Sequence, residues 1–155
     1  MSNLATSHSQ WFSVEVIDDV DFNSLSDFLS GVSYLYPNFN AWLNFTFRRN
    51  LPSGQRKIIL AHDQMKIIGV SLLKNTVDEK KICTFYVSPE FRGLGVGRKL
   101  LDMSLALLNS NDSFITVSSE RKNEIEHTLK SRGFKVSESI TGLYRDESTE
   151  FTYTL

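Results

Sequence analysis

The most informative segment of this sequence spans residues 87–101 and reads VSPEFRGLGVGRKLL. It follows an apolar run typical of a strand and leads into a segment with apolar residues at helical spacing. Its three alternate glycines remove side chains where a backbone must approach a ligand closely or adopt unusual dihedral angles. The first turn of a helix also leaves amide N–H groups unpaired and carries partial positive charge. The segment therefore predicts a phosphate-binding loop at a helix start.

The charges around the glycines favour the same interpretation. Arg92, Arg98 and Lys99 crowd the positive end of the predicted helix, where each cation is unfavourable by about 0.3–1 kcal/mol. A bound polyanion would reverse that penalty. The alternative is a tight turn with solvated basic neighbours, and a glycine-rich loop alone does not separate the two. Neither the dinucleotide fingerprint nor the Walker loop fits, because Arg98 occupies the last glycine position of the first and the G-K-[ST] of the second is absent.

The rest of the chain predicts an α/β fold with a mixed sheet. Strands are expected over residues 11–17, 56–62, 66–73, 79–87, 114–117, 134–140 and 150–154. Helices are expected over 22–32 with Asp21 as the N-cap, from Pro37 onward, over 95–108, and over 118–132 with Gly133 as the stop. The short connections between residues 56 and 87 favour an antiparallel meander. The later strand–helix–strand order adds a crossover, so helices should cover a mixed sheet.

Length and composition fit one folded domain. The chain has 155 residues, 41% of them hydrophobic and 23% charged, and we expect a polar N-terminal tail over 1–10 and a single domain over 11–155. The net charge of −1 lacks the basic excess of a dedicated nucleic-acid binder. Only the pairs Arg48-Arg49 and Arg56-Lys57 leave room for a local basic patch.

Metal, redox and membrane functions find little support. The single Cys83 cannot form an internal disulfide or a cysteine-based metal site, and its apolar surroundings predict a small buried hydrophobe. The histidines, at 8, 62 and 127, lack ligand spacing. No apolar run reaches the roughly 18 residues of a membrane span, and no secretory signal is evident. We expect no metal, no membrane partner and a cytoplasmic location.

The segment around the glycines resembles the signature of the GNAT superfamily of acyl-CoA-dependent N-acyltransferases. In that signature a strand ending in V-x-P is followed by [QR]-x-x-G-x-[GA] and an amphipathic helix. The matching positions are Val87, Pro89, Arg92, Gly95 and Gly97. The predicted order β-α-α-β-β-β-α-β-α-β-β is also similar to the GNAT fold over nearly the whole chain.

This resemblance implies acetyl-CoA as cosubstrate and a primary amine as acceptor. It implies that the CoA pyrophosphate is held by backbone amides of Arg92, Gly93, Leu94, Gly95, Val96, Gly97 and Arg98. It also implies that the pantetheine arm pairs with the strand edge at Phe85, Tyr86 and Val87. In the family the amine attacks the thioester directly, and an amide near Tyr86 or Val87 would stabilise the oxyanion.

The chain departs from the family at the general acid. Many relatives carry N-x-x-A-x-x-L-Y-x-x-x-G-F, of which Gly133-Phe134 preserves the end while Leu129 takes the Tyr position. As substitutes we consider Tyr144, in a late loop or strand, and Glu79, at the start of the central strand. The alternatives are a structural tyrosine and an exposed carboxylate within the charged run 78–81.

The acceptor is not fixed by the sequence. The aromatic segment 34–47 lies where the resembled fold shapes its acceptor site, so Tyr34, Tyr36 and Trp42 are predicted to line an amine-binding cleft, with core packing as the alternative. A protein amine, a small polyamine-like compound and an aminoacyl-tRNA remain open, although the net charge disfavours RNA. The missing tyrosine at Leu129 favours a rival, a non-catalytic module that binds acyl-CoA or a protein. The oligomeric state is open, a homodimer included.

Overall fold

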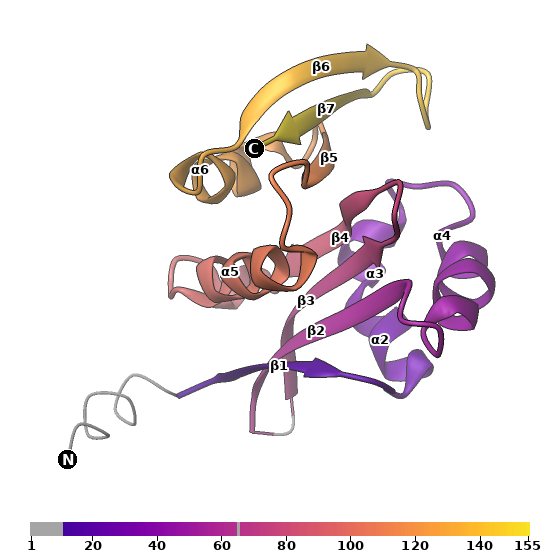
Figure 1. Cartoon of the computed structure of the whole chain (residues 1–155), viewed down its shortest axis with the longest axis vertical. Coiled ribbons are helices and arrows are strands. Elements are labelled where there is room, and N and C mark those ends of the chain that lie inside the picture. Colours follow the sequence, from indigo (N-terminus) through magenta and orange to yellow (C-terminus); the bar gives the residue numbers. More distant parts are fainter. Residues whose placement is uncertain (1–10, 65) are drawn as a thin grey trace.

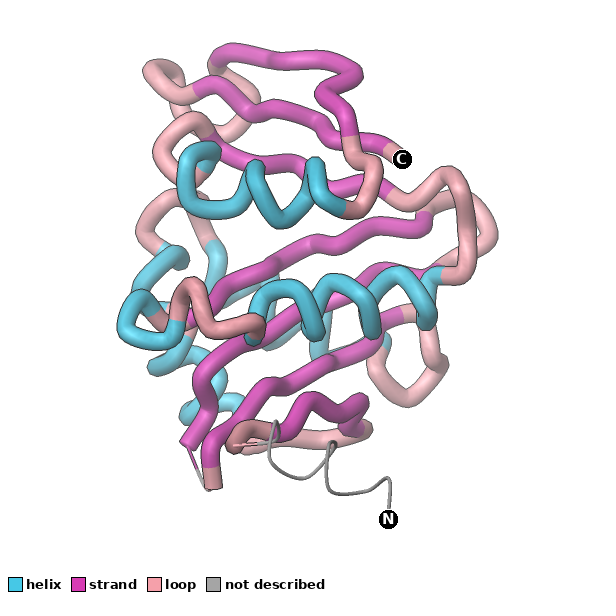
Figure 2. The backbone as a smooth tube through the Cα atoms, turned by 90° about the vertical axis from the view of Figure 1, so that its left-hand side faces the viewer, coloured by secondary structure: helices cyan, strands magenta, loops and turns pink. Residues whose placement is uncertain are grey.

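A seven-stranded mixed sheet forms the centre of the molecule in the computed structural model, which describes residues 11–64 and 66–155 (Figures 1 and 2). The predicted polar tail, residues 1–10, lies outside the described residues. The strand order is β1-β2-β3-β4-β5-β7-β6. The strands are β1 (Ser13–Ile17), β2 (Arg56–Asp63), β3 (Lys66–Asn75), β4 (Lys80–Val87), β5 (Phe114–Ser118), β6 (Lys135–Thr141) and β7 (Thr149–Thr154). The predicted mixed sheet is confirmed, and β2, β3 and β4 form the expected antiparallel meander.

Helices cover both faces of this sheet (Figure 2). One face carries α5 (Val96–Leu108) and α6 (Lys122–Ser131), and the other carries α2 (Phe22–Phe28), α3 (Ser30–Ser33) and α4 (Phe39–Ala41). Strand β2 shows why both faces are needed, since Ile58 packs under α2 and Ile59 packs under α5. None of the helices in the described part of the chain is long and apolar enough to cross a membrane.

The two N-terminal helices differ from their predicted form. Asp21 is the N-cap of α2, as predicted, and accepts a hydrogen bond from the amide of Asn23 at 3.1 Å. The segment expected as one helix over 22–32 divides into α2 and α3 at Leu29. The helix expected from Pro37 is a composite, because α4 passes into a π-helix, η1 (Trp42–Phe47), and a 3-10 helix, η2 (Arg48–Asn50). π-Helical turns often occur at functional sites.

Strands β4 and β5 separate after a short region of pairing. They run parallel and pair only at Lys81 with Phe114 and at Ile82 with Ile115. Beyond that point the two ribbons diverge (Figure 1). The backbone edge of β4 from Cys83 to Val87 is therefore not paired with β5, and this opening positions the site described next.

Candidate functional site

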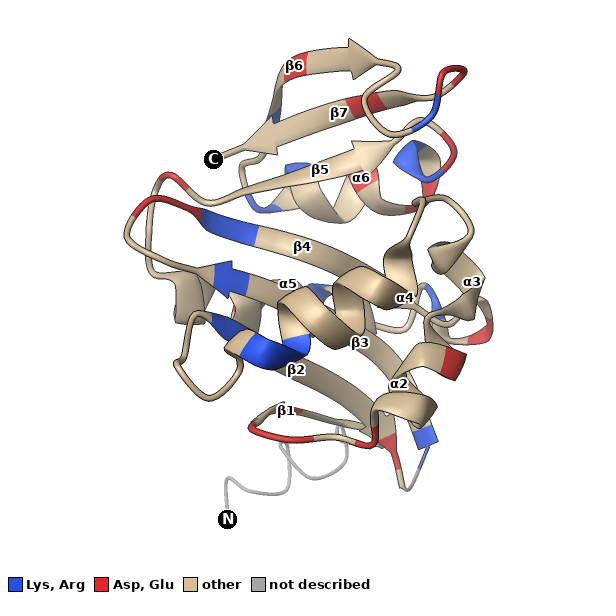
Figure 3. Ribbon diagram, turned by 90° about the vertical axis from the view of Figure 1, so that its right-hand side faces the viewer, with Lys and Arg blue, Asp and Glu red and all other residues tan. Residues whose placement is uncertain are grey.

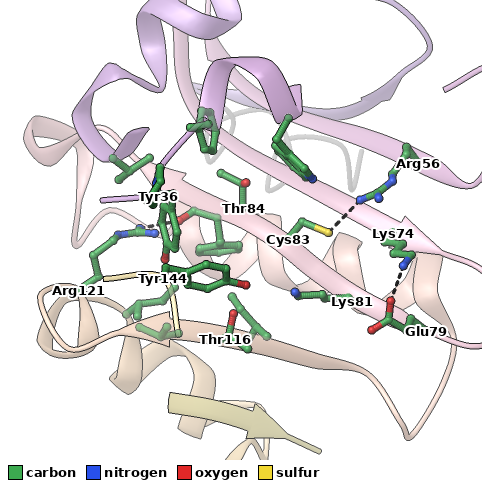
Figure 4. Close-up of a pocket in the computed structure, with 18 residues that line it drawn as sticks. Tyr36, Arg56, Lys74, Glu79, Lys81, Cys83, Thr84, Thr116, Arg121 and Tyr144 are labelled. Atoms are coloured by element: carbon green, nitrogen blue, oxygen red, sulfur yellow. Dashed lines mark hydrogen bonds and ion pairs between the residues drawn. The ribbon is translucent and has the colours of Figure 1, made fainter. Parts of the chain in front are cut away.

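Two cavities meet at the opening between β4 and β5. The first has a volume of about 340 Å³ and is lined by Tyr36, Trp42 and Tyr144 among others; we call it the aromatic cavity (Figure 4). The second has a volume of about 290 Å³ and is lined by the glycines of the β4–α5 loop; we call it the glycine-loop cavity. Phe85, Arg121 and Ile125 line both cavities. A molecule in one cavity can thus approach a molecule in the other beside Phe85.

The glycine-loop cavity owes its shape to glycines that meet different requirements. Gly93 and Gly95 have φ angles of +78° and +92°, a region that residues with a side chain rarely adopt. Gly95 is the N-cap of α5 and provides no side chain to cap the helix. A Cβ atom on Gly97 would lie 3.8 Å from Val87 and 3.9 Å from Phe85. The missing side chain of Gly97 therefore leaves the cavity open against the edge of β4.

The amides of this loop point to an anion. Among the described residues, the amides from Gly93 through Arg98 donate no hydrogen bond, and the first amide of α5 that does is that of Lys99, to Gly95 O at 3.2 Å. Amides in this position carry the positive end of the helix dipole. Together with Arg98, which lines the same cavity, they can hold a phosphate group.

Arg92 fixes the loop to the rest of the molecule. Its Nε donates to Val87 O at 3.1 Å, and its guanidinium forms an ion pair with Glu124 of α6 at 3.0 Å. The guanidinium also lies over the ring of Tyr86, 5.7 Å from the ring centroid. Arg92 thus connects the end of β4 with α6 across the mouth of the cavity.

The structure divides the residues predicted for CoA into groups. Seven of them line the glycine-loop cavity: Phe85, Val87, Arg92, Gly93, Gly95, Gly97 and Arg98. Three have side chains elsewhere: Leu94 is exposed, Val96 is in the core, and Tyr86 packs on the α2 side of the sheet. The backbone of each of these three residues still belongs to the loop or to the edge of β4. The predicted contacts with CoA involve only backbone groups of these residues.

Two of the three aromatic residues predicted for the acceptor line the aromatic cavity. These are Tyr36 and Trp42, whereas the Tyr34 side chain is 73% exposed and is not part of the lining. Tyr144, from the β6–β7 connection, also lines it and contacts Tyr36 edge to face, with ring centroids 5.5 Å apart. Tyr34 and Tyr36 both lie in the turn between α3 and α4, which directs only Tyr36 into the cavity.

Glu79 lies at the far end of the aromatic cavity from Tyr36 (Figure 4). It accepts a hydrogen bond from Lys74, which lowers the pKa of its carboxyl group. A carboxylate held in this way is a weak base at neutral pH. Cys83 was expected to be buried, but it is half-buried and lines the cavity, where its Sγ accepts from Arg56 at 3.4 Å. Burial raises the pKa of the Cys83 thiol, which favours its neutral form.

Sequence reasoning missed Arg121, which lies between the two cavities. Its guanidinium is buried, donates to Phe85 O at 2.5 Å and contacts Glu124 at 3.3 Å. It also lies over Tyr86, 5.6 Å from the ring centroid. Arg121 is the N-cap of α6, where a cation is unfavourable. Arg98 and Lys99 drew attention in the sequence because they are cations at the start of a helix. Arg121 has the same unfavourable position, so the sequence contained a signal for it as well.

Glu150 was also missed, although its strand was predicted. It pairs with Ser118 across β7 and β5, so the two side chains share the face of the sheet that bears Thr116 and the aromatic cavity. Only 3% of Glu150 is exposed, and its Oε1 and the Ser118 Oγ have no hydrogen-bond partner among the described residues. Burial raises the pKa of Glu150 to about 7; Arg145 opposes this shift and Glu120 adds to it.

Tyr36 lines the aromatic cavity and is close enough to Glu150 to be affected by its charge. Burial, and next the negative charge of Glu150, raise the pKa of Tyr36 to about 12, so its hydroxyl stays protonated. Leu129, which the sequence predicted at the position of the tyrosine of the resembled family, is fully buried in the core beside α5. His127, two residues earlier and on the exposed side of α6, lines the glycine-loop cavity.

The comparisons with known proteins agree on one family. A family model described as an acetyltransferase (GNAT) domain matches residues 34–142. A comparison with curated protein sequences found no match. Among solved structures, the NatC complex bound to Gag peptide and CoA aligns with a TM-score of 0.73 and 15% identity over 93% of this chain and 97% of that one.

Two further solved structures show the range of similar proteins. A spermidine N-acetyltransferase SpeG chimera from Vibrio cholerae and hSSAT aligns with a TM-score of 0.64 and 17% identity, over 94% of this chain and 96% of that one. A nourseothricin acetyltransferase aligns with a TM-score of 0.61 and 19% identity, over 66% of each chain. At these identities the likeness shows the shared fold.

Proposed function

Because the chain belongs to the GNAT acetyltransferase family, we propose that it is an acetyl-CoA-dependent N-acetyltransferase that acts on a primary amine. One observation carries the proposal: the glycine-loop cavity and the aromatic cavity share Phe85 and Arg121 at the unpaired edge of β4. One cavity has the chemistry to hold a phosphate, and the other has room for a small acceptor. Their junction provides a place for direct transfer.

The residues of the glycine-loop cavity fit a coenzyme A diphosphate. The amides from Gly93 through Arg98 are free to donate, and Arg98 adds a positive charge. Bound there, acetyl-CoA would supply an activated acetyl thioester. The edge of β4 at Phe85, Tyr86 and Val87 would hold the pantetheine arm by backbone hydrogen bonds, in the manner of an added strand. The carbonyl oxygens of Phe85 and Val87 already accept from Arg121 and Arg92, so the arm would share these oxygens with the two guanidinium groups.

The aromatic cavity would orient the acceptor amine toward Phe85. Tyr36 and Trp42 line this cavity, and Tyr144 lies beside Tyr36 at the end near Arg121 (Figure 4). Holding two reactants in such a geometry can provide an effective molarity of about 10⁵ M or more. An amide N–H near Tyr86 or Val87 would stabilise the negative charge that develops on the thioester oxygen.

Two residues are assigned to move protons. We assign Glu150 as the group that accepts the amine proton, through Tyr36 or a water molecule, because a carboxylate with a pKa of about 7 is matched to neutral pH. Tyr144 would donate a proton to the departing thiolate, which needs little help at a thiol pKa of about 8.5. Glu79 is the alternative base, and its ion pair with Lys74 weakens its case.

Binding and turnover measured together test the proposal. We expect acetyl-CoA to raise the melting temperature, because a ligand at 100 times its Kd stabilises a protein by about 2.7 kcal/mol. We also expect the release of free thiol from acetyl-CoA with at least one amine of a panel, and an acetylated product by mass spectrometry. The absence of any stabilisation by acetyl-CoA would contradict the proposal.

A second function is favoured by the buried Leu129 at the family's tyrosine position. A non-catalytic module that binds acyl-CoA would show the same stabilisation. It would release no thiol with any amine, and substituting Glu150 would leave its CoA affinity unchanged.

A further inference from the structure

Three basic residues form a row across the floor of the aromatic cavity. Arg56 on β2 lies opposite Lys74 on β3, and Lys74 lies opposite Lys81 on β4. All three line the cavity. Lys and Arg gather at the neighbouring ends of these strands in Figure 3. Like charges directly opposite one another destabilise a sheet, so this row is unfavourable unless something balances it.

The protein balances only part of this charge. Glu79 is the one carboxylate that lines the cavity in the described part of the chain, and Lys74 already pairs with it. Within residues 11–64 and 66–155, neither Arg56 nor Lys81 has a carboxylate within 4 Å. Two positive charges thus remain uncompensated on the cavity wall.

Of these two charges, that of Arg56 has the larger desolvation penalty. It is only 8% exposed, and its guanidinium contacts Cys83 Sγ at 3.4 Å and lies 5.8 Å from the ring centroid of Trp42. A buried charge without an ionic partner is expensive. The pair Arg56-Lys57 is therefore not the surface patch that its sequence suggests, since Arg56 faces the cavity.

We propose that the acceptor is a small primary amine whose far end carries a carboxylate or a phosphate. This inference rests on the proposed function and names the substrate class of the same site. The anionic end would lie against Arg56 and Lys81, and the amine would reach the edge of β4 at Phe85. A cationic polyamine would place its second charge against the same row and be repelled.

The dimensions of the cavity agree with such a molecule. Lys81 and Phe85 are four residues apart on one strand, about 13 Å at 3.3 Å per residue. The Lys81 side chain shortens the span between anion and amine. A volume of about 340 Å³ lies in the range of small-molecule sites.

Four amines with the same six-carbon chain test the inference: 6-aminohexanoate, 6-aminohexyl phosphate, hexylamine and 1,6-diaminohexane. Their binding to the protein saturated with CoA is measured by calorimetry, and their acetylation is followed by thiol release from acetyl-CoA. We expect at least one anionic amine to bind about tenfold tighter than hexylamine, because a hydrogen bond to a charged group contributes about 1.5–3 kcal/mol. The diamine should bind most weakly. The two anionic amines distinguish a carboxylate from a phosphate.

Reversing one charge of the row should reverse the preference. In Lys81→Glu, the anionic amines should lose about tenfold in affinity and 1,6-diaminohexane should gain. Lys81→Gln removes the charge without adding one and should reduce the preference, since Arg56 remains, which keeps the test available if the first variant folds poorly. Lys80→Glu is the matched control, because Lys80 points to the opposite face of β4 and donates to Asn75 at 2.6 Å.

Each outcome bears on one proposal. Equal or tighter binding of the diamine, or no binding of either anionic amine, overturns the inference. Lys80→Glu shifting the preference as strongly as Lys81→Glu also overturns it. If an anionic amine binds with the expected preference but acetyl-CoA releases no thiol, the anion-binding role of Arg56 and Lys81 stands and the proposed acetyl transfer is contradicted.

Discussion

Glu150 is a buried carboxylic acid that couples the stability of the fold to pH. Its pKa of about 7 in the folded protein lies above the ordinary value of 4.5. Between these values the folded state retains a proton that the unfolded state has lost. The contribution of Glu150 to the free energy of unfolding is therefore fully present below pH 4.5. It is lost as the pH rises through 7. The loss amounts to about 3 kcal/mol.

Glu150→Gln removes this dependence. The variant should be close to wild type near pH 4.5 and more stable at pH 8, as measured by urea unfolding at several pH values. Glu138→Gln, on the exposed strand β6, is the control. If Glu150 accepts the amine proton, its variant should also lose at least about 100-fold in kcat at neutral pH. An unfolding difference that stays constant from pH 4.5 to 8 would contradict the assigned pKa.

At the level of single residues, sequence patterns located the loop better than the acceptor site. The glycines and Arg98 are local features, and the cavity contains them where the motif placed them. Tyr34 and Tyr36 could not be told apart, because both lie in the turn between α3 and α4, where no periodic pattern indicates the direction of a side chain. Glu150 could not be recognised, since its burial depends on pairing with Ser118, 32 positions earlier in the sequence.

At the level of elements, the start of α5 bears the proposed CoA site and allows a clean test. Gly97 is helical, and the nearest atoms to an added Cβ are 3.8 Å away. Gly97→Glu should therefore fold, and a helical glycine replacement often adds stability. Its carboxylate would enter the glycine-loop cavity and weaken CoA binding by about 100-fold or more, as measured by calorimetry.

The control for Gly97→Glu lies on the same helix. Ala106→Glu adds the same charge on the exposed side of α5 and should bind CoA as the wild type does. Wild-type affinity in Gly97→Glu would contradict the placement of the diphosphate. Gly97 is a better target than Arg92, because a carboxylate at 92 would also face Glu124 and disturb α6.

Elements were predicted well where one pattern governs them. The strands carry apolar residues that both faces of the sheet require, and α5 has a buried face that is apolar except at Ser104. The helix expected over 22–32 was wrong as a single element. Gly31 shows a constraint that local periodicity cannot reveal: a Cβ there would lie 2.2 Å from the hydroxyl oxygen of Tyr86, on a strand far along the chain.

At the level of the whole molecule, the site depends on contacts that no single segment contains. The opening between β4 and β5 exists because their pairing stops at Ile82 and Ile115. The basic row needs three strands in register, and the overall charge of −1 conceals it. The family and the mixed sheet followed from the sequence, whereas the charge of the acceptor cavity required the assembled fold.

An NMR titration of the labelled protein with CoA measures the central claim directly. The account predicts that the amide resonances of Gly93, Gly95 and Gly97 shift on addition of CoA, together with those at the free edge of β4 near Phe85. The amide resonances of the outer strand β6 should not shift. If CoA leaves the glycine amides unshifted, or shifts only residues remote from this loop, the account is contradicted.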